Sequence, residues 1–93
     1  MTVIVTRHAA LVDYLREIGL VSEDAQVVGH ASPELIRGNH VVGILPLHLA
    51  ALADRVTVVP LEVPADLRGQ ELSLEQVRQY AGQPATFRVS QLS

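Results

Sequence analysis

Three neighbouring polar residues, Thr6, Arg7 and His8, form the stretch of the chain best suited to chemistry. A hydroxyl and a guanidinium can hold a phosphate through hydrogen bonds, and an imidazole can carry a proton near neutral pH. These residues follow the β-branched run 3–5, typical of a buried strand, and precede a helical pattern that starts at Ala9. Ligands of open α/β sheets bind at the carboxyl ends of strands, where helix N-termini attract anions. The sequence therefore predicts an anion-binding site at this turn.

Other polar side chains follow the later predicted strands. His30 follows a strand over 25–28, His48 lies in the turn 45–48 after a strand over 40–45, and Arg68 lies in a loop after a strand over 55–61. Parallel strands end at one edge of a sheet, so we expect these side chains to gather beside Thr6, Arg7 and His8. The plainer alternatives are an exposed loop arginine for Arg68 and a half-buried helix residue for His48.

Several other chemistries fit the sequence poorly. The four histidines, at positions 8, 30, 40 and 48, have neither zinc-motif spacing nor neighbouring carboxylates, and we predict no metal site. An Arg-His pair also follows the first strand of phosphohistidine phosphatases, but this chain is much shorter and has Ala9 where those enzymes have Gly. No glycine-rich phosphate loop is present, so we expect no nicotinamide or ATP cofactor.

Length and composition restrict the class of protein further. The 93 residues suffice for one domain over 1–93, 48% are apolar, and the formal net charge is −3. Such a charge argues against duplex nucleic acid as a partner, although a few arginines can bind a small phosphorylated ligand. The absence of cysteine, of a signal peptide and of a membrane-length apolar run leads us to expect a cytoplasmic protein without membrane contact. A domain this small favours a homodimer.

Strands and helices alternate along the whole chain. The expected strands lie at 3–5, 25–28, 40–45, 55–61 and 85–89, and the expected helices at 9–18, 33–36, 46–54 and 73–80. Ser32-Pro33 opens the second helix, and Ser73 with Gln76 forms a capping box at the fourth. This alternation predicts an α/β fold with a mostly parallel five-stranded sheet and helices on both faces. Gly43, alone within a strand, indicates close packing or close approach of a ligand.

Four segments, taken in order, carry a family resemblance. They are 6–10, Gly29-His30, 38–50 and 61–72, and the match extends to about Tyr80. The most specific parts are the turn Leu45-Pro46-Leu47-His48 and the segment Pro-Ala-x-x-Arg-Gly-x-Glu-Leu over 64–72. Together they resemble a small accessory family of type III CRISPR systems, the sixteenth of the Csx series. The family pattern has Asp at the position of Asn39 and Asn at the position of His48.

The resemblance implies a ring nuclease with a small Rossmann-like (CARF-like) fold. Such proteins are dimers that bind cyclic oligoadenylate, usually cyclic tetra-adenylate, and cut it to switch off type III signalling. The implied mechanism needs no metal, because the ribose 2′-hydroxyl attacks its adjacent phosphate. We assign Arg7 to charge stabilisation and His8 to proton transfer or leaving-group contact. The expected ligand-binding residues are Thr6, His30, Leu45, Pro46, His48 and Arg68.

Two other functions stay open at this point. A binding module without catalysis would use the same arginines and the same dimer to sequester or sense the cyclic nucleotide. A structural protein that docks partners at its sheet edge would have no affinity for any adenylate ring.

Overall fold

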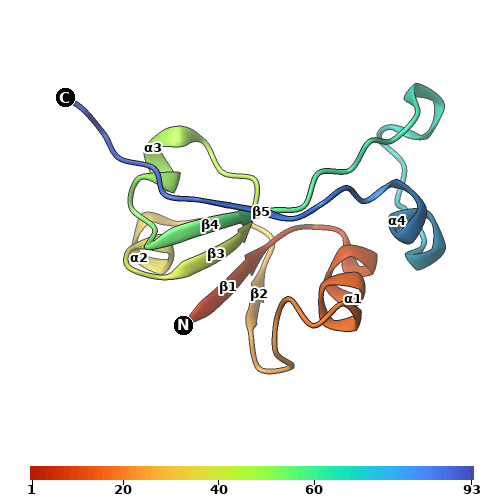
Figure 1. Ribbon diagram of the computed structural model, residues 1–93, viewed down its shortest axis with the longest axis horizontal. Coiled ribbons are helices and arrows are strands. Elements are labelled where there is room, and N and C mark those ends of the chain that lie inside the picture. The colour runs from red at the N-terminus through yellow and green to blue at the C-terminus, as the bar shows by residue number, and fades with distance from the viewer.

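A twisted five-stranded sheet forms the centre of the computed structural model, which describes residues 1–93 (Figure 1). The elements are β1 Thr2–Val5, α1 Ala9–Glu17, β2 Gln26–Val28, α2 Pro33–Ile36, β3 His40–Gly43, α3 Leu47–Ala50, β4 Arg55–Val58, a 3₁₀ turn Ala65–Leu67, α4 Leu74–Tyr80 and β5 Ala85–Phe87. The strand order is β2-β1-β3-β4-β5, in which only β5 is antiparallel to its neighbour. The α/β fold class and the mostly parallel sheet are confirmed.

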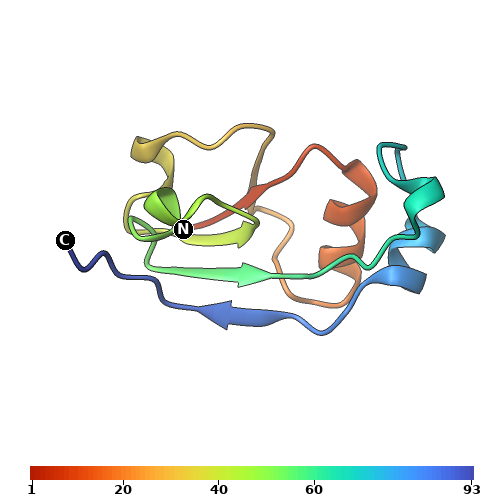
Figure 2. The same ribbon diagram turned by 90° about the horizontal axis from the view of Figure 1, so that it is seen from above.

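Alternate residues of the strands face two separate apolar cores. Ile4 and Val42 pack with Val12 and Leu15 of α1 on one face. On the other face Val41 and Val56 pack with Ile36 of α2 and Ala50 of α3. Figure 2 shows α2 and α3 together near the amino ends of the strands and α1 beyond the carboxyl ends. Helices therefore pack on both faces of the central strands β1, β3 and β4, whereas the edge strands β2 and β5 are largely exposed.

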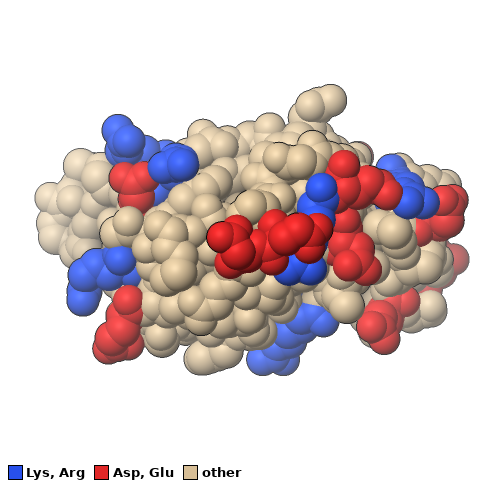
Figure 3. Space-filling model, turned by 90° about the horizontal axis from the view of Figure 1, so that it is seen from below, with Lys and Arg blue, Asp and Glu red and all other residues tan.

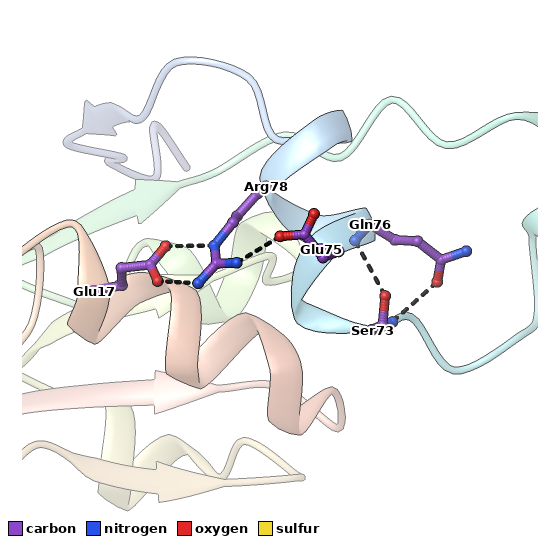
Figure 4. A network of polar contacts seen from close by, with 5 residues as sticks. All are labelled: Glu17, Ser73, Glu75, Gln76 and Arg78. Atoms are coloured by element: carbon purple, nitrogen blue, oxygen red, sulfur yellow. Dashed lines mark hydrogen bonds and ion pairs between the residues drawn. The ribbon is translucent and has the colours of Figure 1, made fainter.

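The short helices begin where the sequence predicts. The Ser32 hydroxyl accepts a hydrogen bond from the Leu35 amide at 3.4 Å, with Pro33 as the first helical residue. Ser73 and Gln76 form the predicted capping box, with bonds of 3.2 and 3.0 Å (Figure 4). Since the first helical N–H groups have no partner within the helix, these side chains satisfy them.

Several elements end earlier than the sequence predicts. β3 stops at Gly43 rather than Leu45, because Gly43 takes a φ of 146° that carries the chain out of the ladder. β4 stops at Val58, and Pro60 has no N–H with which to continue the pairing. α3 covers only Leu47–Ala50, and the following amides of Leu52 and Ala53 bond three residues back in tighter turns. β5 ends at Phe87 rather than Val89.

The fourth helix packs against α1. α4 contacts α1, and its Val77 is fully buried. The Arg78 guanidinium lies between Glu17 of α1 and Glu75 of its own helix (Figure 4), and it lowers the pKa of the Glu17 carboxyl. All three side chains are exposed, so this network adds little to the stability of the fold.

Gly43→Ala should destabilise the protein by about 2 kcal/mol or more. A Cβ at this position would lie 2.5 Å from the Val5 carbonyl oxygen, in a backbone conformation that L-residues rarely adopt. The free energy of unfolding from urea titration measures the loss. Gly19→Ala is the matched control, because its φ is also positive, at 75°, but no atom lies within 4 Å of the added carbon. Equal losses in the two variants would contradict the crowding at Gly43.

Candidate functional site

A cavity of about 410 Å³ opens at the carboxyl ends of β1 and β3. The chain runs from β1 to β2 on one side and then crosses to β3 on the other side, so the cavity lies where the direction of the connections reverses. Ligands of open α/β sheets bind at such a point. Its lining residues are Val5, Thr6, Arg7, His8, Leu11, Leu15, Gly29, Val42, Gly43, Ile44, Val59 and Leu61. We refer to this cavity as the crevice.

The turn 6–8 holds its shape through its own hydrogen bonds. The Thr6 amide donates to the Val28 carbonyl at 2.9 Å, which ties the turn to the end of β2. The Thr6 hydroxyl accepts from the His8 amide at 3.1 Å. His8 is the N-cap residue of α1 with an extended backbone, and its ring makes no capping bond. The turn therefore places two exposed side chains, Arg7 and His8, at the mouth of the crevice.

Arg7 carries a positive charge without an acidic partner. It forms no ion pair, and its one side-chain hydrogen bond is a long Nε–H bond of 3.4 Å to the Gly29 carbonyl. By contrast, Arg16, Arg55 and Arg78 are all paired with carboxylates. An unpaired guanidinium beside an apolar cavity can take a phosphate group at little cost in broken interactions.

Arg68 lies in a second hollow that adjoins the crevice. This hollow has a volume of about 200 Å³, and His8 and Leu61 line both spaces. The Arg68 Nε donates to the Val63 carbonyl at 3.4 Å, and Gln70 beside it donates to the Asp66 carbonyl at 3.1 Å. The loop after β4 thus brings a second exposed arginine to the same edge as Arg7 and His8.

The other predicted contacts lie outside the crevice. His48 lines a separate hollow of about 310 Å³ together with Val89, Ser90 and Gln91. This hollow and the crevice have no lining residue in common. Leu45 belongs to an apolar groove between α3 and β5. Pro46 is the N-cap of α3, and His30 is exposed next to Gly29. Because β3 ends at Gly43, the turn over 45–48 leads away from the crevice toward α3.

Most of the apolar residues that line the crevice cannot be recognised from the sequence. Leu11 and Leu15 come from α1, and Ile44, Val59 and Leu61 come from the segments that follow β3 and β4. In the sequence they resemble ordinary core residues, because nothing in the spacing tells a core position from a cavity wall. The lone Gly43 is the one signal of the cavity in the sequence. It lies where β1 and β3 approach closely, and it also lines the crevice.

His40 is the first residue of β3 and lies at the edge of the sheet opposite the crevice. Its Nε2 is 2.7 Å from the Thr57 hydroxyl, which is 2.8 Å from the Thr86 hydroxyl, so the three residues link β3, β4 and β5. Burial and the charge of Arg55 lower the pKa of His40. No group of three or more His, Cys, Asp or Glu side chains is arranged to hold a metal ion, and no helix has the length and apolar character required to cross a bilayer.

The charges outside the site alternate in sign. Figure 3 shows arginines and acidic side chains interspersed on one face of the molecule, with no continuous basic surface on that face. This distribution agrees with the net charge of −3. A long polyanion needs an extended basic track, so the phosphate-binding capacity of this chain depends on single arginines such as Arg7 and Arg68.

Thr6→Val should loosen the turn without unfolding the protein. The substitution keeps the shape of the side chain and removes the oxygen that accepts from the His8 amide, so that amide should lose about tenfold in hydrogen-exchange protection. Exchange measured by NMR reports the change, and Thr6→Ser, which keeps the hydroxyl, is the control. Unchanged protection of the His8 amide in Thr6→Val would show that the hydroxyl does not hold the turn.

Comparison with known proteins gives one family. Residues 3–90 match the model of a family described as "Putative CRISPR-associated protein (Cas_VVA1548)". No curated protein and no solved structure matches the chain significantly. The matched segment contains every residue of the crevice and, apart from Thr2 at the start of β1, every element of the fold. This chain therefore belongs to that family of CRISPR-associated proteins.

Proposed function

We propose that this protein is a ring nuclease that binds cyclic oligoadenylate, with cyclic tetra-adenylate as its ligand, and cleaves it without a metal ion. The observation that carries the proposal is an unpaired Arg7 and an exposed His8 at the mouth of an apolar cavity, at the switch point of the sheet. Membership in a CRISPR-associated family and the sequence resemblance to the sixteenth Csx family both support it. The function would be to end type III signalling by destroying its second messenger.

The chemical character of the crevice suits an adenylate. Leu11, Leu61 and Ile44 offer apolar surface on which an adenine ring can stack, and a volume of about 410 Å³ lies within the range of about 300–1,000 Å³ typical of small-molecule sites. Arg7 can bind a phosphate oxygen with two parallel N–H donors. Arg68 brings a second positive charge from the adjoining hollow.

The proposed reaction transfers a phosphoryl group within the ligand. The 2′-oxygen of a ribose attacks the adjacent phosphorus while the bond from phosphorus to the 5′-oxygen breaks, which leaves a 2′,3′-cyclic phosphate and a 5′-hydroxyl. His8 acts in proton transfer, either by taking the proton of the 2′-hydroxyl or by contacting the departing 5′-oxygen. Arg7 stabilises the extra negative charge that develops on the phosphate oxygens. The protein mainly aligns the attacking and leaving oxygens.

The proposed active species is a homodimer. Ile44, Leu47 and Phe87 are 77%, 76% and 53% exposed, and all three line the apolar groove between α3 and β5. Ile44 also lines the crevice, so the groove and the crevice are continuous. A second copy seated on this groove would cover the apolar side chains and bring its own crevice close by. Two crevices related by a two-fold axis match a cyclic tetranucleotide of the same symmetry.

One observation favours the alternative of binding without cleavage. No carboxylate or carbonyl orients the His8 ring, whereas catalytic bases are usually held by a third group. A protein that only sequesters the ring would use Arg7 and Arg68 and would need no oriented imidazole. The ligand itself can supply the missing orientation, since catalytic hydrogen bonds often form only in the complex.

Incubation with cyclic tetra-adenylate in EDTA tests the proposed function. We expect linear products ending in a 2′,3′-cyclic phosphate, separated by chromatography and identified by mass. Arg7→Ala should lower the cleavage rate by about 100-fold or more while leaving the unfolding midpoint unchanged, because Arg7 is exposed and unpaired. Arg37→Ala, an exposed arginine outside the hollows, is the control and should cleave normally. An intact ring at stoichiometric protein would favour sequestration, and cleavage only with a divalent ion would refute the metal-free mechanism.

Phe87→Glu should convert the dimer to a monomer and weaken binding of the ring. The substitution places a charge in the apolar groove that we propose to be buried between copies, which is costly without a partner. Light scattering coupled to gel filtration measures the mass in solution. Leu92→Glu is the control, because Leu92 is 99% exposed and lies outside the groove. A wild-type protein that is monomeric at all concentrations would exclude the dimer.

A further inference from the structure

The crevice and the smaller hollow share a single dividing wall. Only His8 and Leu61 line both spaces, so these two residues form the ridge between them. His8 comes from the turn after β1 and Leu61 from the segment after β4, where it forms an isolated bridge with Ala81. The ridge thus stands between two adjoining openings on one surface.

The two hollows differ in size and chemistry. The crevice, of about 410 Å³, has mainly apolar walls, with Arg7 at its rim. The smaller hollow, of about 200 Å³, contains Arg68 and Gln70 together with Leu67 and Leu72. The first can enclose a planar base, while the second is below the usual size of a complete ligand site and can hold part of a neighbouring group.

We infer that the two hollows hold two successive nucleotides of an adenylate chain, with the phosphodiester that joins them passing over His8. This inference rests on the proposed function and adds the number of nucleotides that one protomer recognises. The first base lies in the crevice, the linking phosphate lies at the ridge beside Arg7, and the second nucleoside lies in the smaller hollow beside Arg68. His8 then meets the phosphodiester that joins the two nucleosides.

Recognition of a two-nucleotide unit has a measurable consequence. A linear dinucleotide contains everything that one protomer contacts, so ring closure is not required for binding. Arg68 should contribute to the binding affinity of a dinucleotide. It should not contribute to the binding of a mononucleotide, whose base and phosphate occupy only the crevice and the ridge. Arg7 should contribute to the binding of both ligands, because it lines the crevice.

The experiment compares adenosine 3′-monophosphate with the dinucleotide of 2′-deoxyadenosine, which lacks the attacking hydroxyl and stays intact. Isothermal titration measures both affinities for the wild type, Arg68→Ala and the control Arg37→Ala, which lies outside both hollows. We expect the dinucleotide to bind about tenfold more tightly than the mononucleotide. Arg68→Ala should remove this gain and leave the mononucleotide unaffected. Arg68 and Arg37 are exposed, so both variants should fold.

A second variant tests the crevice directly. Leu11→Phe reduces the space for the first base and should weaken both ligands about equally, with circular dichroism as the check on folding. Equal affinity for the two ligands in the wild type, or an equal loss of both in Arg68→Ala, would overturn the two-hollow arrangement. Cyclic tetra-adenylate assayed in parallel separates the two proposals: if the ring is cut under either of those outcomes, only this inference fails. If the ring is neither bound nor cut, the proposed function fails as well.

Discussion

Crowding between β1 and β3 at their carboxyl ends is the constraint on which the site depends. The backbone at Gly43 approaches the Val5 carbonyl so closely that a Cβ would lie 2.5 Å from that oxygen. A residue with a side chain would push the strands apart or fill the space above them. Because Gly43 has none, β3 leaves the sheet at this point, and the ends of β1 and β3 border an open crevice. The turn 6–8, which also lines the crevice, therefore borders an open cavity.

Exposure limits what the charges of this site can do alone. Arg7, His8 and Arg68 are all exposed, and water weakens the interaction of an exposed guanidinium with a phosphate. Strong stabilisation of a developing charge requires that water be displaced. A large ring lying across the crevice would displace water by itself, and a second protomer on the groove of Ile44, Leu47 and Phe87 would displace more. The proposed ligand and the proposed dimer therefore depend on each other.

The sequence predicts the parts of this structure that depend on local patterns. The β-branched run of β1, the Ser32-Pro33 start of α2 and the capping box at Ser73 are each fixed by neighbouring residues, and each is where the pattern indicates. The ends of β3 and β4 depend on contacts between strands, and the sequence predicts these ends two and three residues too late, respectively. If β3 reached Leu45, the turn 45–48 would lie at the crevice, which is why the sequence predicts His48 beside Arg7. The apolar walls could not be predicted, since a leucine facing a cavity and a leucine facing the core have the same spacing.

His8 and Arg68 line the same hollow and lie next to α1 and α4, two helices that pack against each other. His8 is the N-cap of α1, and Arg68 lies in the loop that leads into α4, so a shift between these helices would change the separation of the two hollows. The ion pairs of Arg78 with Glu17 and Glu75 are exposed and contribute little energy (Figure 4). Leu72 and Val77 are buried, and their apolar contacts supply most of the stabilisation at this junction. The ion pair of Arg78 with Glu17 joins α4 to α1, and the buried side chains contribute more to the stability of this junction than the exposed charges do. The geometry at the ridge of His8 and Leu61 thus depends on Val77, which lies outside the site, and on Leu72, which also lines the smaller hollow.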